Sequence, residues 1–146
     1  MRRQFVLLLA ILGIGATAAL LPGCKSPPTK AEMDAADYGP QPTNHEQLIR
    51  DYLKPKLKDG DSAIIEFRAG PKRLYQQDTL LRPLQYGWGV CVLVNEKNSA
   101  GTYAGFHPIV FYINNGKVIA MNGGPDDSVI GDSYARDGCK ELGAVF

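Results

Sequence analysis

Cys91 and His107 are the two residues of this sequence that could form a nucleophile with its base. A cysteine attacks as the thiolate, and a neighbouring imidazole can take its proton. Neither residue stands in a protease signature, however, and a cysteine inside an apolar strand is more often inert or disulfide-bonded. The other histidine, His45, falls in the first turn of a predicted helix, where a surface residue is expected. We therefore assign no catalytic residue.

Acidic side chains are the second group that could do chemistry, by binding calcium or by acting as acid and base. They lie in turn-like segments, at Asp59, Asp61, Asp126, Asp127 and Asp132. Their spacing does not match an EF-hand loop, so solvated turn carboxylates are the simpler interpretation. The sequence predicts no metal site and no cofactor. A carboxylate pair for glycoside cleavage stays open, because the separation of two carboxylates cannot be read from sequence.

The N-terminus carries a pattern of another kind, which ends at Cys24. Two arginines precede an apolar run from Phe5 to Leu12, small residues follow, and Leu21-Pro22-Gly23-Cys24 closes the segment. This order resembles the signal peptide and lipobox of a bacterial lipoprotein. The resemblance implies removal of residues 1–23 and lipidation of Cys24, whose acyl chains would hold the protein in a membrane. Lys25 differs from the aspartate of an inner-membrane retention signal, which favours the outer membrane, facing the periplasm.

Two alternatives to a lipoprotein remain for this segment. An uncleaved spanning helix needs about 20 predominantly apolar residues, and Gly13 and Gly15 weaken such a helix here. Ordinary secretion would also suit cleavage after Gly23, but the cysteine that follows directly favours lipidation.

Composition favours one domain on a tether and gives no reason to expect a nucleic-acid partner. Removal of residues 1–23 takes two arginines from a chain of formal charge +1, which leaves it at −1. Such a near-neutral chain has no electrostatic footprint for nucleic acid. Residues 24–42, rich in proline and charged residues, predict a lipidated cysteine with a flexible tether, which would reach about 60 Å at full extension. Residues 43–146 predict a single globular domain.

Cys91 and Cys139 remain once Cys24 is lipidated, and such a pair can form a disulfide in an oxidising compartment. Spacing does not show whether the two meet, so two separate thiols are the alternative. A bridge would close a loop of roughly 48 residues and stabilise the fold by up to about 4 kcal/mol through chain entropy.

Helical periodicity predicts a helix from residue 44 to about residue 57. Thr43 and Glu46 have the spacing of a capping box. Apolar residues then share one helical face, at Leu48, Ile49, Tyr52, Leu53 and Leu57. Pro55 should kink the last turn or end the helix near Leu53.

Alternating apolar patterns predict strands at 63–67, 86–95, 108–114 and 117–121, with Gly70-Pro71 as breakers after the first. Asn115-Gly116 marks a hairpin turn, and the strand at 86–95 is apolar on both faces, as in a central strand. Residues 132–142 predict a short C-terminal helix. The predicted fold is therefore α+β, with an N-terminal helix packed on an antiparallel sheet of about four strands.

Two segments together are similar to a family of small, uncharacterised bacterial lipoproteins and envelope proteins. The first is Leu57-Lys58-Asp59-Gly60-Asp61-Ser62-Ala63, in which Gly60 replaces the family's usual proline. The second starts at Gly87-Trp88-Gly89-Val90-Cys91, continues through Val94-Asn95-Glu96-Lys97-Asn98-Ser99 and ends with Gly101, Tyr103, Gly105 and Phe106. The resemblance implies a fold and an envelope setting, not a reaction.

The Gly-rich loop after Asn95 is the best candidate for recognition of a partner. Asn98, Tyr103 and Phe106 could contact an envelope protein, since glycine permits close approach and aromatic side chains anchor interfaces. The alternative is that these aromatics pack over the edge of the sheet. Trp88, within the strongest predicted strand, is expected in the core.

No segment of the sequence identifies a reaction. We expect a membrane-tethered bacterial envelope lipoprotein that serves as a structural or interaction module, with the membrane as its partner through Cys24. One alternative is a hydrolase acting on envelope polymers through carboxylates in a cleft framed by Gly-rich loops. Another is a lipoprotein subunit of a secretion or conjugation apparatus.

Overall fold

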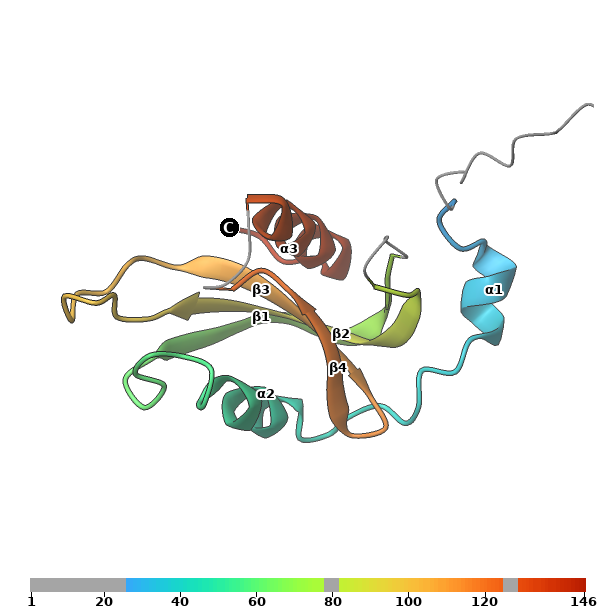
Figure 1. Ribbon diagram of the computed structural model, residues 1–146. Helices are drawn as coiled ribbons and strands as arrows, with labels where there is room; N and C mark the ends of the chain where they lie inside the picture. The colour runs from blue at the N-terminus through green and yellow to red at the C-terminus, as the bar shows by residue number, and fades with distance from the viewer. Residues whose placement is uncertain (1–25, 78–81, 125–128) are drawn as a thin grey trace, which may run out of the picture.

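The computed structural model describes residues 26–77, 82–124 and 129–146. Within these residues, four antiparallel strands follow one another in the sheet in chain order: β1 (Ile64–Gln76), β2 (Gln85–Asn95), β3 (His107–Asn114) and β4 (Lys117–Asn122). Helices α2 (His45–Leu53) and α3 (Val129–Leu142) cover opposite faces of the sheet (Figure 1). The sheet and the C-terminal helix confirm the predicted α+β class.

Helix α2 is shorter than the periodicity of the sequence predicts. It ends at Leu53, ahead of Pro55, although Leu57 beyond the proline is still buried. The predicted capping box does not form, because Asn44 is the N-cap and its side chain makes no capping hydrogen bond. A capping box is present instead between Thr29 and Glu32, where it opens α1 (Lys30–Ala35).

Strand β1 runs through the residues that the sequence suggests as breakers. It continues from Ile64 to Gln76, past Gly70-Pro71, and its pairing with β2 shifts register between Phe67 and Lys72. The prediction that this strand ends at residue 67, with Gly70-Pro71 as breakers after it, is therefore wrong. Irregular pairing lets an edge strand accommodate a proline, which has no N–H to donate to a neighbouring strand.

Strands β2 and β3 form the centre of the sheet and are buried on both faces, as predicted for β2. Side chains on one face pack with α2, among them Val90, Val92, Ile109 and Phe111. Side chains on the other face pack with α3, among them Cys91, Val110 and Tyr112. Asn115 and Gly116 form the predicted turn between β3 and β4, both with positive φ.

Residues 37–42 are docked on the domain, so the prediction of a flexible tether as far as Pro42 is wrong for these residues. Tyr38 is 5% exposed, its ring meets that of Tyr86 edge-on, and Pro42 is buried as well. The Trp88 indole N–H donates to the Gly39 carbonyl at 3.0 Å, and Asn114 Nδ2 donates to the Asp37 carbonyl at 3.0 Å. Burial of the Tyr38 ring stabilises the docked position of this segment. The high proline content alone gives no sign of this contact.

Candidate functional site

Cys24, the predicted lipidation site, lies outside the described residues. The described chain starts at Ser26 and leads into α1, none of whose residues is buried. In the described parts of the chain no helix has the length and apolar character needed to cross a membrane.

The two other cysteines are joined by a disulfide. Cys91 lies in the centre of β2 and Cys139 faces it from α3, with both side chains fully buried and their Cα atoms 5.1 Å apart. A cysteine in this bond has no thiol to ionise, so the dyad of Cys91 with His107 does not exist in this state. The bond instead fixes α3 to the central strand.

Residues 96–106 form a protruding hairpin between β2 and β3, here called the arm. Lys97 and Tyr103 pair as an antiparallel bridge, and the Asn98 amide donates to the Thr102 carbonyl at 2.8 Å. Asn98 Oδ1 accepts from the backbone amides of Ala100 and Thr102, at 2.9 and 3.1 Å. Asn98 was predicted to bind a partner. Its side-chain oxygen instead accepts hydrogen bonds that fix the conformation at the tip of the arm.

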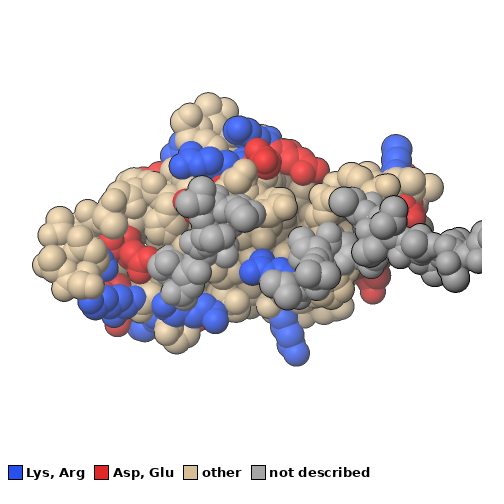
Figure 2. Space-filling model, turned by 45° about the horizontal axis from the view of Figure 1, so that its top comes forward, with Lys and Arg blue, Asp and Glu red and all other residues tan. Residues whose placement is uncertain are grey.

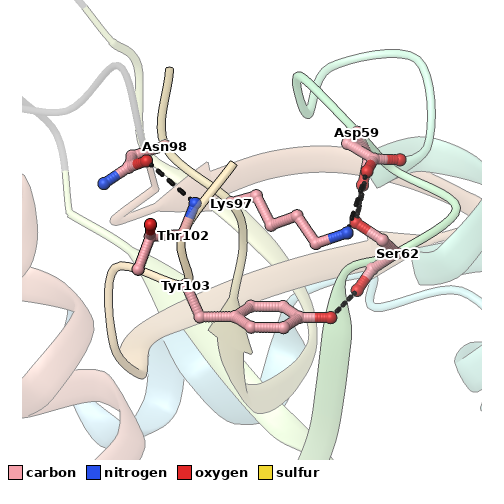
Figure 3. Close-up of polar contacts among 6 residues, drawn as sticks. All are labelled: Asp59, Ser62, Lys97, Asn98, Thr102 and Tyr103. Atoms are coloured by element: carbon pink, nitrogen blue, oxygen red, sulfur yellow. Dashed lines mark hydrogen bonds and ion pairs between the residues drawn. The ribbon is translucent and has the colours of Figure 1, made fainter. Parts of the chain in front are cut away.

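The arm is tied to the turn at Asp59–Ser62, which connects α2 to β1 (Figure 3). The Tyr103 hydroxyl donates to the Ser62 carbonyl at 2.9 Å. Lys97 Nζ lies 3.5 Å from Asp59 Oδ2 and 5.6 Å from the centre of the Tyr103 ring. We call these contacts the latch. They bring together the two sequence segments on which the family resemblance rests.

The latch also places a serine, a carboxylate and a lysine side by side, a set found in some nucleophilic sites. Ser62 Oγ donates to Asp59 Oδ2 at 2.6 Å and to the Asp59 carbonyl at 3.2 Å, so it closes the turn. That hydroxyl, and then Lys97, lower the pKa of Asp59. A carboxylate with a lowered pKa is a weak base, and the arrangement is better suited to holding the turn and the arm together than to activating Ser62.

The aromatic side chains of the arm are partly exposed. Tyr103 is 42% exposed and Phe106 is 46% exposed. The hydroxyl of Tyr103 is held by the latch, so its ring is fixed with one part still facing solvent. Residues 98–106 include no charged side chain, and the outermost left tip of the molecule in Figure 2 is correspondingly tan, with blue and red atoms beginning beside it. Both aromatics therefore remain available to a partner.

His45 is placed differently from the sequence expectation, whereas Trp88 lies against the core, as expected. His45 is half-buried, with its ring 6.1 Å from that of Phe67, rather than a plain surface residue. Trp88 packs beside the α2-side core without being fully buried. Within the ranges that the structure describes, no group of three His, Cys, Asp or Glu residues could hold a metal ion. Asp126 and Asp127 lie outside the described residues.

A shallow crevice lies at the β4 edge, with a volume of about 320 Å³. It is lined by side chains of α2, β4 and both ends of the β1–β2 connection, including Tyr52, Gln76, Arg82 and Ile119. Gln76 Oε1 is buried there and has no hydrogen-bond partner among the described residues. Arg82 donates to the Met121 carbonyl at 3.1 Å and to Asn122 Oδ1 at 3.2 Å, which closes that end of the strand.

Sequence reasoning found the arm but missed the latch. The role of Ser62 in the latch could not be predicted, because the hydrogen bond that its carbonyl accepts from the Tyr103 hydroxyl joins residues 41 positions apart. Comparison with family models, curated proteins and solved structures gave no match. The functional assignment therefore rests on the residues and geometry described above.

Proposed function

We propose that this protein is a lipid-anchored lipoprotein of the bacterial envelope and that it acts as an interaction module through its arm. The N-terminal pattern ending at Cys24 supports the anchor, and the arm supports the recognition of an envelope protein. The observation that carries the proposal is the arm: it protrudes from the domain, its uncharged residues 98–106 expose two aromatic side chains, and the latch holds it in a fixed position.

The disulfide between Cys91 and Cys139 supports an envelope location. Disulfides persist in oxidising compartments such as the periplasm and are rare in the reducing cytosol. Lys25 is not the aspartate of an inner-membrane retention signal, so we propose the outer membrane, with the domain facing the periplasm.

The anchor is tested by metabolic labelling with a fatty-acid precursor. Cys24→Ser should abolish the label, because the sulfur that carries the diacylglyceryl group is gone. Cys139→Ser is the matched control, since it removes a different cysteine and should retain the label. Label that persists on Cys24→Ser would refute lipidation at this residue, and recovery in the inner-membrane fraction would refute the outer-membrane assignment.

The arm is tested by photo-crosslinking in intact cells. Phe106 is the better position for a photoreactive amino acid, because replacement of Tyr103 breaks its hydrogen bond to Ser62. Tyr134 on α3, which is 48% exposed, is the matched control. A defined protein adduct from position 106, lost when Tyr103→Ala is added and absent from position 134, is expected. Equal adducts from both positions would show nonspecific contact and contradict the proposal.

A further inference from the structure

The point where the N-terminal segment docks and the arm lie at opposite ends of the sheet. Tyr38 and Gly39 contact Tyr86 and Trp88, near the start of β2, whereas the arm follows Asn95 at the end of that strand. The 11 residues of β2 span about 34 Å at 3.4 Å per residue. Figure 1 shows α1 at one end of the molecule and the arm at the other.

The docking contacts form a defined joint rather than a chance contact. Arg73 lies over the rings of Tyr38 and Trp88, with its Cζ at 5.1 and 5.9 Å from their centres. Gly39 has φ +64°, and a Cβ there would lie 2.7 Å from Asn114 Oδ1 and 2.8 Å from the Asn115 amide nitrogen. A larger residue could not pass this close to the β3–β4 turn, so the path of the chain at the joint is fixed.

The joint shortens the chain between an anchor at Cys24 and the domain. Residues 25–29 reach at most about 17 Å and residues 36–37 about 7 Å when extended. The six residues of α1 add about 9 Å as a helix. The end of the domain that carries the β3–β4 turn is then held within about 33 Å of the lipid. This distance is about half the reach of an undocked tether ending at Pro42.

We infer that the end with the β3–β4 turn faces the anchoring membrane and that the arm receives a protein partner standing off that membrane, not one embedded in it. This inference rests on the proposed lipid anchor. The arm suits a site outside the bilayer because its exposed aromatics are accompanied by hydroxyl and amide side chains at Asn98, Ser99 and Thr102. The arm suits a partner surface of low charge, because residues 98–106 have no charged side chain that could pair with a charge on the partner.

The test uses the full lipidated chain reconstituted in vesicles of phosphatidylethanolamine and phosphatidylglycerol that contain a headgroup quencher. Lys117→Cys, beside the β3–β4 turn, and Ala100→Cys, at the tip of the arm, each add one free thiol for a fluorophore, since Cys24 is acylated and Cys91 and Cys139 are bonded. The fluorophore at position 117 should lose most of its intensity, and that at position 100 little. Equal quenching, or stronger quenching at position 100, overturns the inference.

A second pair of variants tests the joint itself. Gly39→Ala should reduce the difference in quenching between positions 117 and 100, because the added Cβ displaces the docked segment. Gly101→Ala is the matched control: its φ is +77°, but a Cβ there meets nothing within 4 Å. An unchanged difference in Gly39→Ala would overturn the role of the joint. Failure of the wild-type chain to float with the vesicles would instead refute the anchor, and with it the orientation.

Discussion

Helices α2 and α3 cover opposite faces of the same sheet, yet they are held by different means. On the α2 face, large aliphatic and aromatic side chains such as Ile49, Leu53 and Phe111 are fully buried. On the α3 face the helix buries Ala135, Cys139 and Leu142, and a disulfide joins it to β2. Packing of apolar side chains stabilises the α2 face, whereas a covalent bond adds to the packing on the α3 face.

Phe111→Ala should cause the largest loss of stability, about 3–5 kcal/mol, because it empties the centre of the α2-side core. Val110→Ala, its neighbour on β3, faces α3 and should cost less, about 2 kcal/mol, since only two methyl groups are removed. Urea unfolding of the two variants measures the difference. A larger loss of stability for Val110→Ala than for Phe111→Ala would contradict the expectation that packing on the α2 face contributes more to stability.

Cys139→Ala should destabilise the protein by about 2–4 kcal/mol, because it releases the loop that the disulfide closes. Native-state hydrogen exchange should show lost protection in α3 with protection in α2 retained. Wild-type protein treated with a reductant is the control and should show the same pattern. Equal loss in both helices would mean that the two faces unfold as one unit.

Gly138→Val should cost about 1–3 kcal/mol by overpacking the contact between α3 and β3. A Cβ at this position already lies 3.1 Å from Val110 Cγ2, and the valine adds two methyl groups in the same direction. Gly138→Ala adds only the Cβ and improves helix propensity, so its melting temperature should lie above that of the valine variant. The opposite order would indicate that α3 can shift on the sheet without cost.

The smallest effect expected is a loss of stability at high pH that belongs to the α3 face. Burial, followed by the charge of Glu141, raises the pKa of Tyr112 from 10.0 to about 12. At pH 8, well below both pKa values, the phenol is neutral in both states. Between pH 10 and 12 it ionises in the unfolded chain but not in the folded one, so stability falls, by about 1 kcal/mol at pH 11.

Chemical unfolding at pH 8 and pH 11 measures this loss, with Tyr112→Phe as the control. The variant has no phenol to ionise at this position, so its stability should fall less between the two pH values. The remaining fall in the variant would come from other ionisable groups. An identical fall in both proteins would contradict the raised pKa.

Local pattern predicted much of the fold. The Asn115-Gly116 turn and the two-sided apolar character of β2 fixed the centre of the sheet, because both signals depend on neighbouring residues. The register shift in β1 and the docking of Tyr38 were not predictable in this way, since each depends on contacts with residues distant in sequence. Pro40 and Pro42 led to the prediction of a tether for the docked segment. Composition does not show that the Tyr38 ring within this segment is buried against the domain.

The candidate site was predicted less completely than the fold. Exposed Tyr103 and Phe106 follow from a Gly-rich loop with isolated aromatics. The internal role of Asn98 and the contact with Ser62 do not, because a polar side chain looks the same in sequence whether it bonds a partner or its own backbone.

The position of the joint also determines how the domain would carry mechanical load. A pull between the N-terminal segment and a protein held on the arm would enter near Tyr38 and leave after Asn95, along the axis of β2. The hydrogen bonds from β2 to β1 and β3 run across that axis. They would therefore be loaded in shear and resist together, whereas a pull at right angles would peel them apart one pair at a time.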